Sequence, residues 1–393
     1  MQEVNIKFYK YRLRDGYEYY NTIDSKQKLI NSRNIKSYIY NIESNFNLKY
    51  VESDEIVFIF FSHSFLDVVR TILVDPITQS IRENLKKGIT KKVVLFCEDM
   101  DWYSDESGTT EIIKTLNTYF GNDIDKLYIT LTNINWKFDW GNLNVIYNLG
   151  CFPFVFGLNY IEAYKHDLSK LDRTKSLFTN QNEPRAVRLY FYKFLIDNNL
   201  LDKFEYSFFF KHSDKKMLTW ENLEGGNDTL DKIENFNFPV KAFDNETNDD
   251  YYKKIKIINF EKTSNSYIDV NIETALFNKD FFGFSEKTFK SIICKKPFII
   301  FGSLHTYKGL NELGFKTFPT LINEEKLDSG FNDWEFKERL QFFFDEVKRI
   351  AEMDIEVVKQ YYIDSLEICE FNYAHLLNLI HNDYNTFKKL ITI

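Results

Sequence analysis

The pattern of apolar and polar positions is clearest between residues 267 and 319. Residues 267–274 alternate as a strand does, and the apolar side of a helix follows at 285–293. The fully apolar run 297–301 predicts a short buried strand, and a second helix is predicted between the glycines at 302 and 314. Strand, helix, strand and helix in this order predict parallel strands joined by crossover helices. In such sheets, ligands bind beyond the carboxyl ends of the strands.

The N-terminal part of the chain shows a similar succession of strands and helices. Two apolar runs, 55–61 and 92–97, predict buried strands, and polar residues follow each of them directly. Further strands are predicted at 4–12, 127–131 and 145–148, and helices at 65–74, 76–88 and 109–120. This part is therefore predicted to be an α/β domain with mostly parallel strands.

The pattern loosens after residue 150 and becomes regular again near residue 177. Segments 177–180 and 205–210 are predicted strands, with a helix from Pro184 to Asn198 between them. The polar stretch 211–262 is interpreted as loops with one helix, 229–236. Amphipathic helices are predicted at 336–353, 355–369 and 373–390. With a typical domain size of ~150 residues, we expect two domains, 1–165 and 166–393.

Composition supports two folded domains and argues against several classes of function. The chain has 393 residues, of which 44% are hydrophobic, and a formal net charge of −8, which gives no footprint for nonspecific nucleic-acid binding. The charged N-terminal segment and the lack of a long uncharged apolar run predict a cytoplasmic protein without signal peptide or membrane span. Four widely separated cysteines predict a reducing compartment and no zinc site: Cys97, Cys151, Cys294 and Cys369.

The start of the predicted helix at 285–293 carries the groups of an anion-binding site. Ser285 has the side chain of an N-cap, and Lys287 lies in the first turn. Free backbone N–H groups and the helix dipole favour an anion such as a phosphate at this end, and Lys287 adds a positive charge. Glu273 and Glu286 are acceptors suited to sugar or ribose hydroxyls. The alternative is an ordinary capped helix with Lys287 and Glu286 in solvent.

Three runs in this region carry a resemblance to a known family. Asn271–Thr274, Ser285–Phe289 and Lys296–Gly302 resemble the donor-binding motif of the fucosyltransferase-like glycosyltransferases (family ten type). In that family a Glu-Asn-Ser element precedes a Thr-Glu-Lys helix start and a Pro-Val-Val-x-Gly strand. Here Thr274 and Ala275 replace the Asn-Ser pair, and Ser285 replaces the Thr. A later run, Gly314–Phe318, is similar to a segment of viral or phage members of the wider group.

The resemblance implies an α/β protein of the GT-B fold, in which two Rossmann-like domains face each other across a cleft. Residues 1–165 would form the acceptor-side domain, and residues 166–393 would form the nucleotide-sugar-binding domain with C-terminal helices. In such proteins the terminal helices often cross back to the first domain. The resemblance also makes Glu286 an acceptor for donor hydroxyls, most directly those of the ribose.

A second candidate for donor binding lies at the start of the second domain. A predicted strand ends at Asn180, and two arginines, Arg185 and Arg188, lie on the first turns of the following helix. Guanidinium groups match phosphate oxygens in shape and charge, so this pair could clamp a diphosphate. Fucosyltransferase-like proteins have a similar strand, Asn and Arg arrangement. The alternative is a surface helix with ordinary arginines.

Transfer of a sugar to a hydroxyl with inversion needs a general base, which should come from the first domain. Glu98 and Asp99 follow the strand at 92–97 directly, and His63, after the strand at 55–61, is their competitor. Each of the three could instead be a polar loop residue, and Asp99 could also be a helix cap. Asp99 and Asp101 also form a D-x-D, which in metal-dependent GT-A glycosyltransferases holds a divalent cation.

These observations predict a metal-independent glycosyltransferase that uses a nucleotide-sugar, such as a GDP- or UDP-sugar, as co-substrate and needs no other cofactor. The expected acceptor is a hydroxyl of a glycan. The alternatives are transfer to a hydroxymethylated base in viral DNA, a noncatalytic sugar-nucleotide-binding protein, and a GT-A metal enzyme. No pattern in the chain identifies the donor sugar or the oligomeric state.

Overall fold

The computed structural model divides the chain into two compact units, residues 1–161 with 377–393, and residues 162–376. The sequence predicts a boundary at 165/166 and assigns 377–393 to the second domain, so the last segment is where the two divisions differ. The residues that the structure describes are 2–10, 48–61, 69, 76–97, 106–131, 139–147, 172–181, 186–208, 263–273, 284, 286–329 and 333–392.

The first unit is built on a parallel sheet. Its six strands are β1 (Gln2–Lys10), β2 (Leu48–Glu52), β3 (Ile56–Phe61), β4 (Lys92–Cys97), β5 (Leu127–Leu131) and β6 (Asn144–Tyr147). They lie in the order β2-β1-β3-β4-β5-β6, and every neighbouring pair is parallel. All of these strands except β2 are predicted by the sequence. Strand β2 escapes prediction because it is a short edge strand in which only Leu48 is buried.

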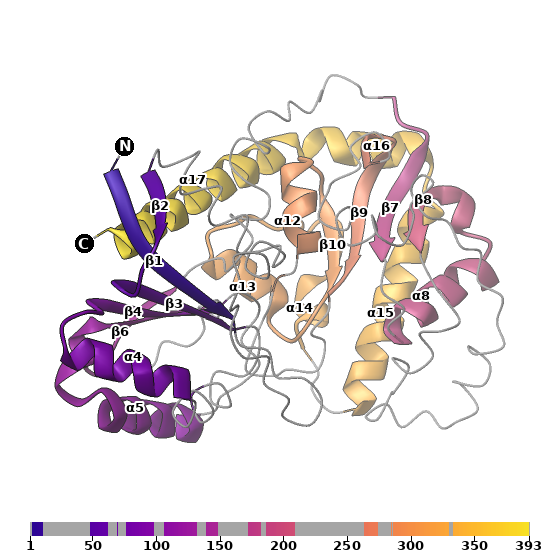
Figure 1. Ribbon diagram of the computed structural model, residues 1–393. Helices are drawn as coiled ribbons and strands as arrows, with labels where there is room; N and C mark the ends of the chain where they lie inside the picture. The colour runs from indigo at the N-terminus through magenta and orange to yellow at the C-terminus, as the bar shows by residue number, and fades with distance from the viewer. Residues whose placement is uncertain are drawn as a thin grey trace. The chain divides into compact units, whose positions relative to one another are not determined.

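Buried apolar side chains lie on both faces of this sheet, whose first strands are drawn in indigo in Figure 1. Alternate residues of β3 and β4 pack against helices α4 (Pro76–Lys86) and α5 (Glu106–Phe120), forming a core that includes Val57, Ile59, Val93, Leu95, Ile81, Leu85, Ile112 and Leu116. A short 3-10 helix, η2 (Gly121–Lys126), follows α5. On the opposite face, Phe387 of α17 (Leu366–Ile391) lies with its ring centroid 5.5 Å from Phe58 and 6.1 Å from Phe96.

The end of α17 is also held by a lysine of the first sheet. The Nζ of Lys92, at the start of β4, donates to the carbonyls of Lys389, Leu390 and Thr392 at 3.2, 3.1 and 3.0 Å. Carbonyls in the last turn of a helix have no partner within the helix. A cation there fills this role by donating hydrogen bonds to them, and its charge interacts favourably with the helix dipole. Partial burial lowers the pKa of Lys92 from its usual value.

The second unit has a smaller parallel sheet. Its four strands are β7 (Lys175–Gln181), β8 (Phe204–Phe208), β9 (Ser266–Ile272) and β10 (Phe298–Phe301), in the order β10-β9-β7-β8. Helix α8 (Ala186–Asp197) and the 3-10 helix η3 (Leu201–Lys203) connect β7 to β8, α12 (Glu286–Ile293) connects β9 to β10, and α13 (Thr306–Glu312) follows β10. The predicted strand–helix–strand–helix unit is therefore confirmed.

Three further helices follow: α14 (Glu324–Leu327), α15 (Asp333–Ala351) and α16 (Ile355–Asp364), before α17. The sequence predicts a break between residues 369 and 373, but the break lies at Ser365. There the backbone N–H of Ser365 donates to the carbonyls of Tyr361 and Tyr362, both at 3.1 Å, and its Oγ donates to Tyr361 O at 2.8 Å. Ser365 is the C-cap of α16, and α17 then runs without interruption through the predicted break.

The α/β class and the two parallel sheets with helices are confirmed. The packing of two such domains across a cleft stays a prediction. The predicted helices at 65–74 and 229–236 fall outside the described residues. In the part of the chain that the structure describes, no helix is long and apolar enough to span a bilayer.

Candidate functional site

The direction of the crossovers locates the expected ligand site of the second sheet. From β7 the chain moves to β8 on one side, and from β9 it moves to β10 on the other side. The strand order therefore reverses between β7 and β9, and in open α/β sheets ligands bind at the carboxyl ends of the strands at such a reversal. Strand β9 ends at Ile272, directly before Glu273, and β7 ends at Gln181, directly after Asn180.

Strand β9 is buried on both faces, although its residues alternate in polarity. Ile268, Val270 and Ile272 form the apolar side. Asp269, Asn271 and Glu273 point the other way, and each is bonded to a group within or just after α12. A strand that alternates in this way usually has one face in water, so the burial of the polar face is the unusual property of β9.

Glu273 joins the end of β9 to the first turn of α12. Its side chain is fully buried, and Oε1 accepts a hydrogen bond of 2.5 Å from Thr288 Oγ1. The backbone N–H of Glu273 donates to Phe301 O at 2.9 Å, which extends the pairing of β9 with β10 by one residue. Glu273 is thus near the predicted place, but its carboxylate points into the core toward Thr288.

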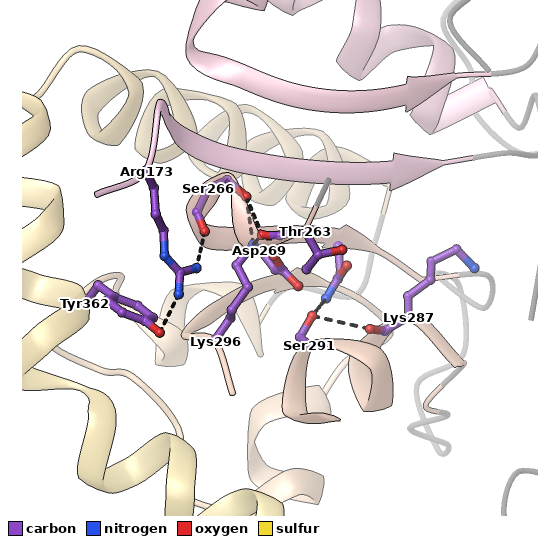
Figure 2. A network of polar contacts seen from close by, with 9 residues as sticks. Arg173, Thr263, Ser266, Asp269, Lys287, Ser291, Lys296 and Tyr362 are labelled. Carbon is purple, nitrogen blue, oxygen red and sulfur yellow. Dashed lines mark hydrogen bonds and ion pairs between the residues drawn. The ribbon is translucent and has the colours of Figure 1, made fainter. Parts of the chain in front are cut away.

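Asn271 makes the next connection to the helix. Its Nδ2 donates to Ser291 Oγ at 2.8 Å. Ser291 Oγ in turn donates to the carbonyl of Lys287 at 3.3 Å (Figure 2). Lys287 itself is half-buried, and its side chain extends away from Asp269 and Lys296. Both Lys287 and Thr288 lie in the first turn of α12, at the carboxyl end of β9.

Arg188 lies at the same edge of the sheet. It is 1% exposed, and its Nη2 donates to the carbonyl of Ile272, the last residue of β9, at 3.2 Å. The alternative interpretation of Arg188 as an ordinary surface arginine is therefore wrong. The contact with the backbone of β9 explains its burial, and the predicted contact with a diphosphate stays a prediction.

The N-terminus of α13, which follows β10, is occupied by a side chain of the protein. Asp328 accepts from Tyr307 N at 3.1 Å and from Lys308 N at 2.8 Å. Burial raises the pKa of Asp328, and these two hydrogen bonds oppose the rise. Gly302 allows the close turn into α13, because a Cβ there would lie 2.4 Å from Thr306 Oγ1. The backbone donors of α13 are thus already bonded, which leaves α12 as the better candidate for an external anion.

The run Gly314–Phe318, which resembles a segment of viral proteins, is held by internal contacts. Asn372 bonds both the N–H and the carbonyl of Lys316 at 2.8 Å. Glu324 accepts from Thr317 Oγ1 and from Phe318 N, both at 2.7 Å, and burial raises the pKa of Glu324 to about 7. These contacts give the run a structural role within the second unit.

A second polar group lies at the opposite, amino end of β9 (Figure 2). Lys296 forms an ion pair with Asp269 and donates to Thr263 O at 3.1 Å and to Ser266 Oγ at 2.8 Å. Arg173 donates to Ser266 O at 2.5 Å and to the hydroxyl of Tyr362 at 2.6 Å. Burial lowers the pKa of Lys296, and the carboxylate of Asp269 opposes that shift. None of these residues is among the site residues that the sequence predicts; the regular spacing of Asp269, Asn271 and Glu273 was the available signal.

Most of the other predicted site residues fall outside the part of the chain that the structure describes. These are His63, Glu98, Asp99, Arg185 and Ser285, together with the side chains of Asn180 and Glu286. The strands before the candidate bases are described: β3, which precedes His63, lies beside β1 where the order of the first sheet reverses, and β4, which precedes Glu98 and Asp99, is the next strand. Asp101 of the D-x-D is not described either.

Comparison with known proteins gives similarity in structure only. No family model and no curated protein matches the sequence. Solved structures that match include a trehalose-6-phosphate synthase from E. coli bound with UDP-2-fluoro glucose, at 9% identity and a TM-score of 0.41, covering 94% of this chain and 79% of that chain. An apo structure of OtsA matches at 12% identity and a TM-score of 0.42, with coverage of 94% and 79%. The synthase from Burkholderia multivorans matches at 8% identity and a TM-score of 0.39, with coverage of 93% and 76%. Values this low carry no functional argument, so function is argued from the residues.

Proposed function

We propose that this protein is a glycosyltransferase that binds a nucleotide-sugar donor, a GDP- or UDP-sugar, at the carboxyl edge of its second sheet. The observation that carries the proposal is the position of α12, whose first turn is bonded to the end of β9 at the reversal of strand order. A helix N-terminus in this position, with Lys287 in its first turn, suits the diphosphate of a nucleotide-sugar.

The residues around this helix start supply the chemistry that transfer needs. Lys287 and the arginines Arg185 and Arg188 neutralise the negative charge that grows on the diphosphate as the bond to the sugar breaks, and Ser285 donates a hydrogen bond to it. Glu286 accepts hydrogen bonds from donor hydroxyls. The sequence predicts the same role for Glu273. Its carboxylate, however, is fully buried and bonded to Thr288, which supports a role in positioning the first turn of α12.

The acceptor hydroxyl needs a base, and we assign this role to Glu98 or Asp99, with His63 as the competitor. A carboxylate that follows a central parallel strand stands at the edge where substrates of such sheets bind. We propose a glycan hydroxyl as the acceptor. A hydroxymethylated base in viral DNA is the second candidate acceptor, and the net charge of −8 disfavours it.

A thermal-shift screen with GDP-, UDP- and ADP-sugars tests donor binding, since a ligand that binds the native state raises the melting temperature. Hydrolysis and transfer assays with the donor that binds, with and without EDTA, then test catalysis and metal independence. A donor that binds without turnover indicates the noncatalytic protein, and loss of turnover in EDTA indicates the GT-A alternative with Asp99 and Asp101.

Lys287→Ala is the most direct variant, and Lys290→Ala on the same helix is its matched control. We expect Lys287→Ala to weaken donor binding and turnover with little change in melting temperature, because removing a lysine that is only half-buried usually costs little stability. Lys290 lies in the last turn of α12, away from the N-terminus, so Lys290→Ala should bind donor as the wild type does. Equal donor affinity in both variants and the wild type would remove Lys287 from the site.

A further inference from the structure

Polar residues of β9 and of Glu273, the residue after it, contact residues of α12 and of the short segment after it. These contacts form a continuous row, which we call the polar seam. It consists of three pairs: Glu273 with Thr288, Asn271 with Ser291, and Asp269 with Lys296. The exposed fraction of each of the six residues is between 0% and 4%. Figure 2 labels Asp269 and Lys296, the pair nearest the amino end of the strand, together with Ser291 of the middle pair and Lys287.

The seam is a costly way to hold a helix on a sheet. Burying polar groups lowers stability unless every group finds a partner, and well-packed apolar residues would serve stability as well. The other face of β9 and the apolar positions of α12, Phe289, Ile292 and Ile293, are buried in the usual way. What hydrogen bonds add to such packing is direction, because they form only within a narrow range of distances and angles.

The two pairs nearest the carboxyl edge fix α12 in two respects. Same-face residues of a strand lie roughly 6.6 Å apart, while helix residues three apart rise by about 4.5 Å, so two simultaneous bonds leave little freedom to slide. Because Thr288 and Ser291 also share one side of the helix, the same bonds oppose rotation about its axis. The helix start is thereby set relative to the end of β9.

Lys287 is connected to both pairs. It is covalently joined to Thr288, and its carbonyl accepts the hydrogen bond of Ser291. We infer that Glu273 and Thr288 are positioning residues of the donor site: their hydrogen bond sets the place of the first turn of α12, and so of Lys287, which faces the diphosphate. The inference rests on the proposed function. The effect of losing this hydrogen bond depends on how far the first turn of α12 moves, since a displacement of about 1 Å can lower activity roughly a hundredfold.

Thr288→Val tests the inference, because it removes the hydroxyl and keeps the shape. We expect the dissociation constant for the GDP- or UDP-sugar selected by the thermal-shift screen to rise about tenfold, measured by calorimetric titration. Thr288→Ser restores the hydroxyl and should bind within about twofold of the wild type. The control is Ile292→Val, which loses a buried methylene group from the same helix but no polar contact. Ile292→Val should lower the melting temperature and leave donor affinity unchanged.

A double variant separates positioning from a general loss of stability. If Thr288 acts through Lys287, then Lys287→Ala with Thr288→Val should bind donor no more weakly than Lys287→Ala alone, while the changes in melting temperature add. Additive losses of affinity, or equal losses in Thr288→Val and Ile292→Val, would overturn the inference.

Failure of the positioning role and failure of the proposed function give different results. If Lys287→Ala weakens donor binding but Thr288→Val binds as the wild type does, the positioning role is wrong and the proposed function stands. If the wild type binds none of the GDP-, UDP- and ADP-sugars, the proposed function fails, and the inference fails with it.

Discussion

Strands β3 and β9 are both interior strands, yet they bury different residues. The described side chains of β3 are Ile56, Val57, Phe58 and Ile59, and all are apolar. Strand β9 has one apolar face and one polar face, both buried. A strand covered on both sides therefore needs no polar residue for stability. Where polar residues are retained and paired, as in β9, they specify where the neighbouring helix lies.

The largest expected effect in this comparison comes from breaking the charged pair of the polar seam. Lys296→Met leaves Asp269 as a buried carboxylate without its cation, so we expect a loss of about 3–5 kcal/mol of unfolding free energy in guanidinium denaturation. The double variant Asp269→Leu with Lys296→Met should regain most of this loss, because apolar residues then fill the space. A double variant as unstable as the single one would contradict the idea that packing could replace the pair.

The apolar counterpart is Phe387, which covers the first sheet over Phe58 and Phe96. Phe387→Ala should lower the unfolding free energy by about 3 kcal/mol, at the low end for a buried phenylalanine because the end of a helix can shift. Phe387→Leu, which keeps most of the apolar volume, is the control and should cost clearly less. If both variants lost the same unfolding free energy, the packing of Phe387 on the first sheet would depend on the shape of its ring and not on apolar volume alone.

Glu286→Gln, at the first residue of α12, distinguishes a role in helix stabilisation from a role in donor binding. Loss of a charge-assisted hydrogen bond costs about 1.5–3 kcal/mol, so donor affinity should fall roughly ten- to a hundredfold in calorimetric titration. Glu325→Gln, in the first turn of α14, is the matched control for the helix dipole and should lower only the melting temperature. A donor affinity within twofold of the wild type for Glu286→Gln would remove Glu286 from the site.

The smallest expected effect is a pH dependence from Glu324, an acid placed among polar partners in the second unit. Burial raises its pKa from 4.5 to about 7, so the folded state binds the proton more tightly than the unfolded state does. The resulting stabilisation is fully present below about pH 4.5 and is lost as the pH rises through about 7. Given its partial exposure, we expect on the order of 1–2 kcal/mol.

Denaturation of the wild type and Glu324→Gln at several pH values between 4 and 8 measures this contribution. The wild type should lose stability relative to Glu324→Gln as the pH rises. Glu325→Gln, which changes the exposed neighbour, should follow the wild type. Parallel pH profiles for the wild type and Glu324→Gln would contradict the raised pKa.

The sequence was sufficient for the elements whose apolar runs are long or regular, such as β3, β4 and α12. It missed β2 and α14, which are short, and it placed the break before α17 too late because the apolar stripe continues across Ser365. The reversal of strand order between β7 and β9 depends on which strands pair, and no local pattern encodes that.

The candidate site was predictable in its parts but less so in its contacts. Glu273 was singled out because it ends a predicted strand, and Lys287 because it lies in the first turn of the predicted helix. The partner of Glu273 was missed because alternation along a strand normally signals a face in water. Thr288 and Ser291 bond to β9 only once the helix has packed on the sheet, so their importance follows from tertiary contacts.

The path of α17 has a consequence for synthesis on the ribosome. The first unit includes residues 377–393, whose Phe387 covers one face of its sheet and whose last carbonyls bond to Lys92. During translation the strands of this unit emerge early, but that face stays uncovered until the final turns of α17 have left the exit tunnel. Vectorial folding would therefore complete the second unit first, and the nascent N-terminal sheet would be a substrate for chaperones in the interval.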